Sequence, residues 1–327
     1  MKAPEVRTLR RSGDPLDKFN MVILGDGFQR RELPVFEKHS RLLSIRLLKM
    51  KPFSGVAKRI NVYAISTASV DSGVTMVGAP KDTFYGVQGS WLGPGDYPGH
   101  FGTPHQDRII DTAALAAPEQ AAGVRIVIVN YPAGGGRGSH ADRTVFVPLF
   151  MVDDTGLPAT SVEQKKDFVE FTAHECGHAI ADLAEEYISC NVHTVGELHR
   201  NQQTPEETAV NPVVKWRPLA RPPELDSNGT FKVVHKQGDR MASRNSEPPG
   251  PVVGRGVTGM LGLYWGCMDI DPLAASASAR AQCDPWEDPR GAPFYRPMAR
   301  CRMRFQTQPF CRVCADGIQT IIQEATQ

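Results

Sequence analysis

The chain has 327 residues, of which 37 are Lys or Arg and 36 are Asp or Glu, and its basic residues are scattered among the acids, so no basic stripe is present to attract nucleic acid. Its hydrophobic content of 41% is enough for one large domain or two. Apolar runs long enough to span a membrane, about 18 residues, are absent, and residues 1–15 lack an apolar segment, which predicts no membrane span and no signal peptide in this chain.

The first half of the chain predicts strands that alternate with helices. Short runs rich in β-forming residues predict strands, whereas apolar side chains at helical spacing, with Arg and Lys on the opposite side, predict a helix. Strands separated by helices indicate an α/β (α+β) fold with a mixed twisted sheet. The expected strands are 19–24, 60–65, 125–129 and 144–148, and the expected helix is 32–50.

A helix expected from about Ser161 to Ala184 carries the sequence His-Glu-Cys-Gly-His, whose outer members are His174 and His178. Residues four apart lie on the same face of a helix, so the two imidazoles can bind one metal ion, for which zinc is the usual occupant. Glu175, beside the first histidine, is placed to take a proton from a metal-bound water. The motif predicts a zinc hydrolase.

The region after this helix is rich in Pro, Gly and polar residues, and only a last helix, about 316–325, is predicted in it with ease. It holds six of the seven cysteines, an even number that favours up to three disulfides in a secreted or extracytoplasmic protein over free thiols. The Cys-x-x-Cys pair at Cys311 and Cys314 is by itself a weak metal or redox signal. We expect an N-terminal subdomain, 1–188, and a C-terminal subdomain, 189–327, that together form one catalytic domain.

Several further segments resemble one family, the IgA-peptidase-type zinc metallopeptidases. These segments are Asn20 to Phe28 (NMVILGDGF), Lys51 to Phe53 with Arg59 to Tyr63, Ser69 to Val74, Val127 to Gly138, His174 to Tyr187, Lys215 with Trp216, and Tyr295 to Pro297 with Cys301 to Arg304. The resemblance implies a metzincin-like catalytic domain with Met303 as the Met-turn methionine, packed beneath the metal. Phe305 stands where metzincins commonly have a tyrosine, so Tyr295 is the candidate for stabilising the transition state.

The third zinc ligand is not decided by the spacing. In the simpler metzincin pattern, a glycine turns the chain after the second histidine and brings in a ligand six residues beyond that histidine. Here that position is Ala184, which cannot bind zinc, and Glu185 and Glu186 follow. An unbroken helix would place Glu185 about 10 Å along the axis from His178, so the helix must end or bend first. Glu185 and Glu186 are alternatives, the resemblance slightly favours Glu186, and Asp182 is an outside candidate.

We therefore predict a zinc metalloendopeptidase in which a zinc-bound water attacks the peptide carbonyl, with Glu175 as general base and then as the acid that protonates the leaving amine. The substrate would be a protein or peptide, and residues 143–148 are expected to supply an edge strand that pairs with it. The alternatives are a catalytically silent protein of the same fold that binds proteins or glycans, and a zinc hydrolase of non-peptide amides. The sequence does not determine the oligomeric state.

Overall fold

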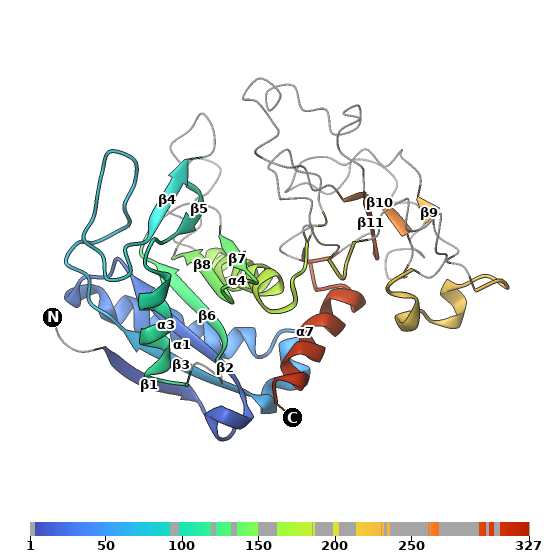
Figure 1. Ribbon diagram of the computed structural model, residues 1–327, viewed down its shortest axis with the longest axis horizontal. Coiled ribbons are helices and arrows are strands. Elements are labelled where there is room, and N and C mark those ends of the chain that lie inside the picture. Colours follow the sequence, from blue (N-terminus) through green and yellow to red (C-terminus); the bar gives the residue numbers. More distant parts are fainter. Residues whose placement is uncertain are drawn as a thin grey trace. The chain divides into compact units, whose positions relative to one another are not determined.

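The computed structural model describes residues 4–91, 98–118, 122–131, 136–149, 162–184, 186, 199–202, 214–229, 231, 234–235, 261, 263–267, 294–298, 301–303 and 308–326. It contains two compact units, Met1–Ala181 with Ile318–Gln327, and Asp182–Gly317. Figure 1 shows the elements of both. The subdomain boundary expected after residue 188 stays a prediction.

A six-stranded mixed sheet forms the frame of the first unit, with strand order β1-β3-β2-β6-β8-β7. The four inner strands β3, β2, β6 and β8 run parallel, and β1 and β7 pair antiparallel at the two sides. The inner strands are mostly apolar and almost wholly buried, as expected of parallel strands covered on both faces. The strands are β1 (Glu5–Arg10), β2 (Phe19–Asp26), β3 (Ile60–Ser66), β6 (Ala122–Val129), β7 (Arg137–Ser139) and β8 (Thr144–Pro148), and β4 (Gln88–Trp91) and β5 (Pro98–Gly102) form a separate hairpin.

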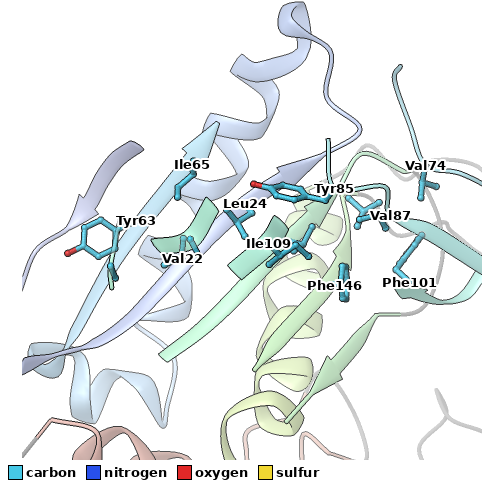
Figure 2. Packing of buried hydrophobic residues seen from close by; sticks show 14 of the residues in the cluster. Val22, Leu24, Tyr63, Ile65, Val74, Tyr85, Val87, Phe101, Ile109 and Phe146 are labelled. Carbon is cyan, nitrogen blue, oxygen red and sulfur yellow. The ribbon is translucent and has the colours of Figure 1, made fainter. Parts of the chain in front are cut away.

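The two faces of the sheet are covered by different helices, because successive strand residues point to opposite faces. Val22 and Leu24 of β2 lie in one core cluster with Ile109 of α3 (Gln106–Ala114), and Figure 2 shows these side chains packed together. On the other face lie α1 (Leu33–Leu47) and α4 (Val162–Ala181), which are joined by an edge-to-face contact between the rings of His39 and Phe168. α2 is a single turn, Phe53–Val56.

A buried carboxylate closes the end of β2. Asp26 accepts hydrogen bonds from the Thr83 hydroxyl (2.8 Å), the Tyr85 amide (2.8 Å) and the Val87 amide (3.0 Å). Burial raises the pKa of Asp26, and the hydrogen bonds oppose this rise. Gly27 follows with φ 75°, and a Cβ there would overlap the carbonyl group of Gly73. The Gly-Asp-Gly segment therefore fixes the loop after β2 and is structural.

The described parts of the second unit include a small sheet and several turns. The sheet has the order β11-β10-β9, with β9 (Val234–His235), β10 (Leu263–Cys267) and β11 (Phe294–Arg296). α7 (Arg312–Glu324) begins in this unit, where Arg312 binds Glu224 (2.9 Å) and the Leu219 carbonyl (2.7 Å). Burial acts against the charge of Glu224, but the hydrogen bond from Arg312 outweighs it and lowers the pKa of Glu224. Among the described residues, no helix is both long and apolar enough to cross a membrane.

Candidate metal centre

The His-Glu-Cys-Gly-His motif lies in the last two turns of α4, on the helix that the sequence predicted. The Nε2 atoms of His174 and His178 are 3.3 Å apart, and the two rings meet at 82° with centroids 4.9 Å apart. His174 is buried, with 1% of its surface exposed, whereas His178 is partly exposed. The two imidazoles therefore converge through their Nε2 atoms at the surface of the helix.

This distance fits a zinc ion. Zinc binds imidazole nitrogen at about 2.0–2.1 Å with tetrahedral geometry, which places two such nitrogens about 3.4 Å apart. The observed 3.3 Å between Nε2 atoms agrees with that spacing. The pair can supply two ligands without a change of rotamer.

Two glycines, one just before β7 and one within it, allow Glu175 to lie close to this strand. The Glu175 side chain is 5% exposed. A Cβ on Gly136 would lie 2.8 Å from Cγ and 2.9 Å from Cδ of Glu175. A Cβ on Gly138 would overlap the backbone carbonyl of Glu175 and lie 2.8 Å from Cβ of His178. Only residues without a side chain allow the strand to lie this close to the helix, so Gly136 and Gly138 set the position of the motif.

β7 is the edge strand beside β8, and the expectation that residues 143–148 form that edge is wrong. β8 lies inside the sheet, between β6 and β7. β7 pairs with β8 on one side, through Arg137 with Phe146, Gly138 with Val145 and Ser139 with Thr144. α4 packs against both strands, and Figure 1 shows the three elements side by side. The edge strand therefore runs directly beside the helix that carries the motif.

α4 ends at Ala181, earlier than the expected Ala184, because Asp182 has φ 51°. This left-handed conformation stops the helix, and Asp and Asn tolerate it better than most other residues. His199 fixes the turn: its Nδ1 lies 2.8 Å from the Asp182 carbonyl oxygen, to which it must donate, and 3.4 Å from the Asp182 carboxylate. Asp182 was an outside candidate for the third zinc ligand, and in the structure it is the residue that ends the helix.

Glu186 is wholly buried within the second unit. Its backbone amide donates to the carbonyl of Met303 (2.9 Å), and its Oε1 accepts from Nδ2 of Asn201 (3.1 Å). The same oxygen lies 3.1 Å from Sγ of Cys314 and 3.9 Å from Sγ of Cys311. The carboxylate of Glu186 is thus surrounded by thiols and an amide.

Other predicted site residues are described only in part. Met303 is fully buried, and its role as a Met-turn residue stays a prediction. Glu185 lies outside the described residues. Tyr295 is placed by its backbone in β11, without a description of its side chain.

The family model for IgA Peptidase M64 matches residues 7–223, about two thirds of the chain. The chain belongs to the IgA peptidase M64 family. The resemblance inferred from the motifs is confirmed, and membership makes the chain a peptidase with a protein or peptide substrate. The matched residues include all of α4, whereas Cys301, Cys311 and Cys314 lie beyond them. A search of curated proteins found no match to the chain.

The expected disulfides are not found among the described thiols of this M64 peptidase. Cys176, Cys301, Cys311 and Cys314 are free and buried. The Sγ atoms of Cys301 and Cys314 are 3.6 Å apart, well beyond the bond length of about 2.05 Å. The side chains of Cys190, Cys267 and Cys283 lie outside the described part of the structure.

The four thiols have different electrostatic surroundings. Burial raises the pKa of Cys176, as does the charge of Glu175, so Cys176 behaves as a small apolar side chain. Burial also raises the pKa of Cys301, to about 12, and that of Cys314. For Cys311 burial acts in the same direction, but hydrogen bonds from Cys301 and Cys314 outweigh it and lower the pKa to about 6.

The grouping of Glu186 with three cysteines and Asn201 was missed in the sequence. Asn201 is fully buried and bonds to the Ala184 amide and carbonyl as well as to Glu186. The Cys-x-x-Cys pair was a signal for part of this cluster. Nothing in the sequence singles out Asn201, because its partners Ala184 and Glu186 lie beyond the range of local sequence patterns.

Proposed function

We propose that this M64 peptidase is a zinc-dependent metalloendopeptidase with a metzincin-like catalytic domain. The observation that carries the proposal is the 3.3 Å separation of the Nε2 atoms of His174 and His178, on the helix that also presents Glu175. The pair has the spacing of two zinc ligands, and Glu175 is the adjacent carboxylate that the chemistry needs.

The turn at Asp182 supports a choice between the two candidate third ligands. In the metzincin pattern the turning glycine comes three residues after the second histidine, and the ligand comes three residues after that glycine. Here the left-handed residue is Asp182, one position later. The same count from Asp182 leads to Glu185. Glu186 is the less suitable alternative, because its carboxylate is already bonded to Asn201 and lies beside two thiols. We therefore propose Glu185 as the third ligand.

Each residue then has a defined task. Zinc, when bound, supplies the Lewis acid that polarises the scissile carbonyl and lowers the pKa of a water molecule. Glu175 removes the proton from the attacking water with its carboxylate and passes it to the nitrogen of the leaving amine. The nearly complete burial of Glu175 limits its motion, so the carboxylate is oriented before the substrate arrives.

An extended peptide can bind along β7. As the outer strand of the sheet, β7 has one side paired with β8 and the other side directed away from it. A substrate strand added there would be held by main-chain hydrogen bonds, which do not depend on sequence. Because Gly138 lies against Glu175, the middle of such a substrate would lie close to the base. This arrangement favours cleavage inside a chain over cleavage at its ends.

The test is cleavage of casein and of a peptide library by the wild-type protein, the chelated protein and the His178→Ala variant. We expect cleavage by the wild type, loss on chelation and recovery with Zn²⁺, whereas His178→Ala should lose activity together with the zinc ion held by the histidine pair. Cleavage that survives in metal-free protein would refute the proposal. A zinc-loaded protein that cleaves only small acylated amides would support the non-peptide hydrolase, and one that cleaves nothing would support the silent binding protein.

Export from the cytoplasm stays a prediction. That expectation was based on disulfides among the C-terminal cysteines, and those of them that the structure describes, Cys301, Cys311 and Cys314, are free. The roles of Met303 beneath the metal and of Tyr295 beside the transition state also stay predictions. Substitution of either residue in the cleavage assay tests them, with kcat as the quantity expected to fall.

A further inference from the structure

A second group of metal-binding side chains lies within the second unit, apart from the motif on α4. It consists of Cys301, Cys311, Cys314 and Glu186, whose ligand atoms all lie within 4.8 Å of one another. All four residues are buried, with exposed fractions of 3% or less. They come from three segments, namely the segment that follows the helix stop at Asp182, the segment of Met303, and the start of α7.

The distances within this group fit one tetrahedral zinc ion. Zinc binds sulfur at about 2.3 Å and oxygen at about 2.0 Å, which places two sulfurs about 3.8 Å apart and a sulfur and an oxygen about 3.5 Å apart. The two Sγ atoms of Cys301 and Cys314 are 3.6 Å apart. Oε1 of Glu186 lies 3.1 Å from Sγ of Cys314 and 3.9 Å from Sγ of Cys311. The observed sulfur–oxygen distances lie on both sides of the ideal separation, so the side chains need to shift only slightly to bind zinc.

The surroundings of the group also suit a metal site. The backbone amide of Cys311 donates to Sγ of Cys301 (3.2 Å), and that of Cys314 donates to Sγ of Cys311 (3.4 Å). Amides that donate to sulfur stabilise the negative charge of a thiolate, the form in which cysteine binds zinc. Asn201 orients the Glu186 carboxylate through Nδ2. Ligands held in this way by a second layer of hydrogen bonds are typical of metal centres.

A disulfide explains the group less well. A bond between any two of the three cysteines would leave the third thiol and the Glu186 carboxylate buried together. A single divalent cation would instead use all four side chains as ligands.

We propose that Cys301, Cys311, Cys314 and Glu186 bind a second, structural zinc ion. Four protein ligands complete the tetrahedron and leave no position for water, so the site is closed and does not catalyse. It ties the segment after α4 to the Met303 segment and to the start of α7. The proposal does not depend on the activity proposed above, because none of its ligands belongs to the histidine pair.

The test is the zinc content of the purified full chain, measured by elemental mass spectrometry after dialysis against metal-free buffer. We expect two zinc ions per chain in the wild type, one in His178→Ala and one in the double variant Cys311→Ser, Cys314→Ser. Cys176→Ser is the matched control, since Cys176 is also free and buried but lies on α4, and it should retain both ions. A zinc content of one in the wild type, abolished by His178→Ala, would overturn the second site.

A second measurement covers the case in which the double variant does not fold. His178→Ala protein, stripped of metal and titrated with Co²⁺, should develop the near-ultraviolet charge-transfer band of a thiolate-bound cobalt ion, and its three cluster thiols should become protected from alkylation. The absence of the band, or an intact mass that shows a disulfide among these cysteines, would refute the proposal. Neither result depends on peptide cleavage, so a failed second site and a failed peptidase assignment are distinguishable.

Discussion

Replacement of Gly138 by alanine should disturb the catalytic centre without touching any of its functional groups. The new Cβ would overlap the Glu175 carbonyl and lie 2.8 Å from Cβ of His178. Carbon atoms in contact prefer about 3.5–4.0 Å, so β7 and α4 would have to separate by about 1 Å. Overpacking of this kind costs about 1–3 kcal/mol of stability, and a displacement of about 1 Å near a catalytic group can cost roughly 100-fold in rate.

The assay measures kcat/KM for a peptide substrate together with the thermal unfolding of the same sample. We expect Gly138→Ala to lower kcat/KM about 100-fold and to lower the melting temperature, with the protein still folded at 25 °C. Gly13→Ala is the control, because a Cβ there meets only the flexible end of the Lys18 side chain. Wild-type kcat/KM and melting temperature in Gly138→Ala would show that β7 does not pack on α4 as described.

Three further predictions concern the second unit and the helix stop, each measured by thermal or denaturant unfolding. Asp182→Gly should leave stability nearly unchanged, whereas Asp182→Val should cost roughly 1–2 kcal/mol, because φ is 51°; equal effects would contradict the helix-stop role. Asn201→Ala removes three hydrogen bonds and should cost about 1–3 kcal/mol, while the exposed Asn228→Ala should cost little. The ion pair with Arg312 lowers the pKa of Glu224 from 4.5, so its stabilisation is present above pH 4.5 and is lost as pH falls through the lowered value. Glu224→Gln should therefore unfold at lower temperature at pH 7 and lose less stability on acidification than the wild type, and parallel pH profiles would refute this.

The parts of the fold that local sequence patterns determine were predicted well. The strands at 19–24, 60–65, 125–129 and 144–148 and the helix that carries the motif all appear in the structure, with small shifts at their ends. They are apolar or periodic segments, in which successive residues favour the same secondary structure. β7 was missed because it has three residues, one of them glycine, and its strand conformation is fixed by its pairing with β8. The assignment of the sheet edge failed for the same reason.

In the candidate site, too, the residues set by local spacing were predicted, whereas those set by tertiary structure were not. His174, Glu175 and His178 follow from a spacing within one helix turn, which sequence alone reveals. The helix stop at Asp182 depends on a backbone conformation that glycine usually signals, and here an aspartate adopts it. The cysteine cluster could not be predicted because Glu186 and Cys314 are far apart in the chain, and an even number of cysteines equally suggested disulfides. Residue counts give no information about which thiols meet.

A comparison of the wild type with Glu175→Gln at equal zinc content tests most directly whether the protein is a zinc peptidase with Glu175 as general base. Both proteins should bind the same amount of zinc, because the histidines are intact, and both should unfold at similar temperatures. Cleavage of casein and of the peptide library should fall about 100-fold or more in Glu175→Gln, since the carboxylate that moves the proton is gone. Equal cleavage by the two proteins, at equal zinc content, would contradict that role of Glu175.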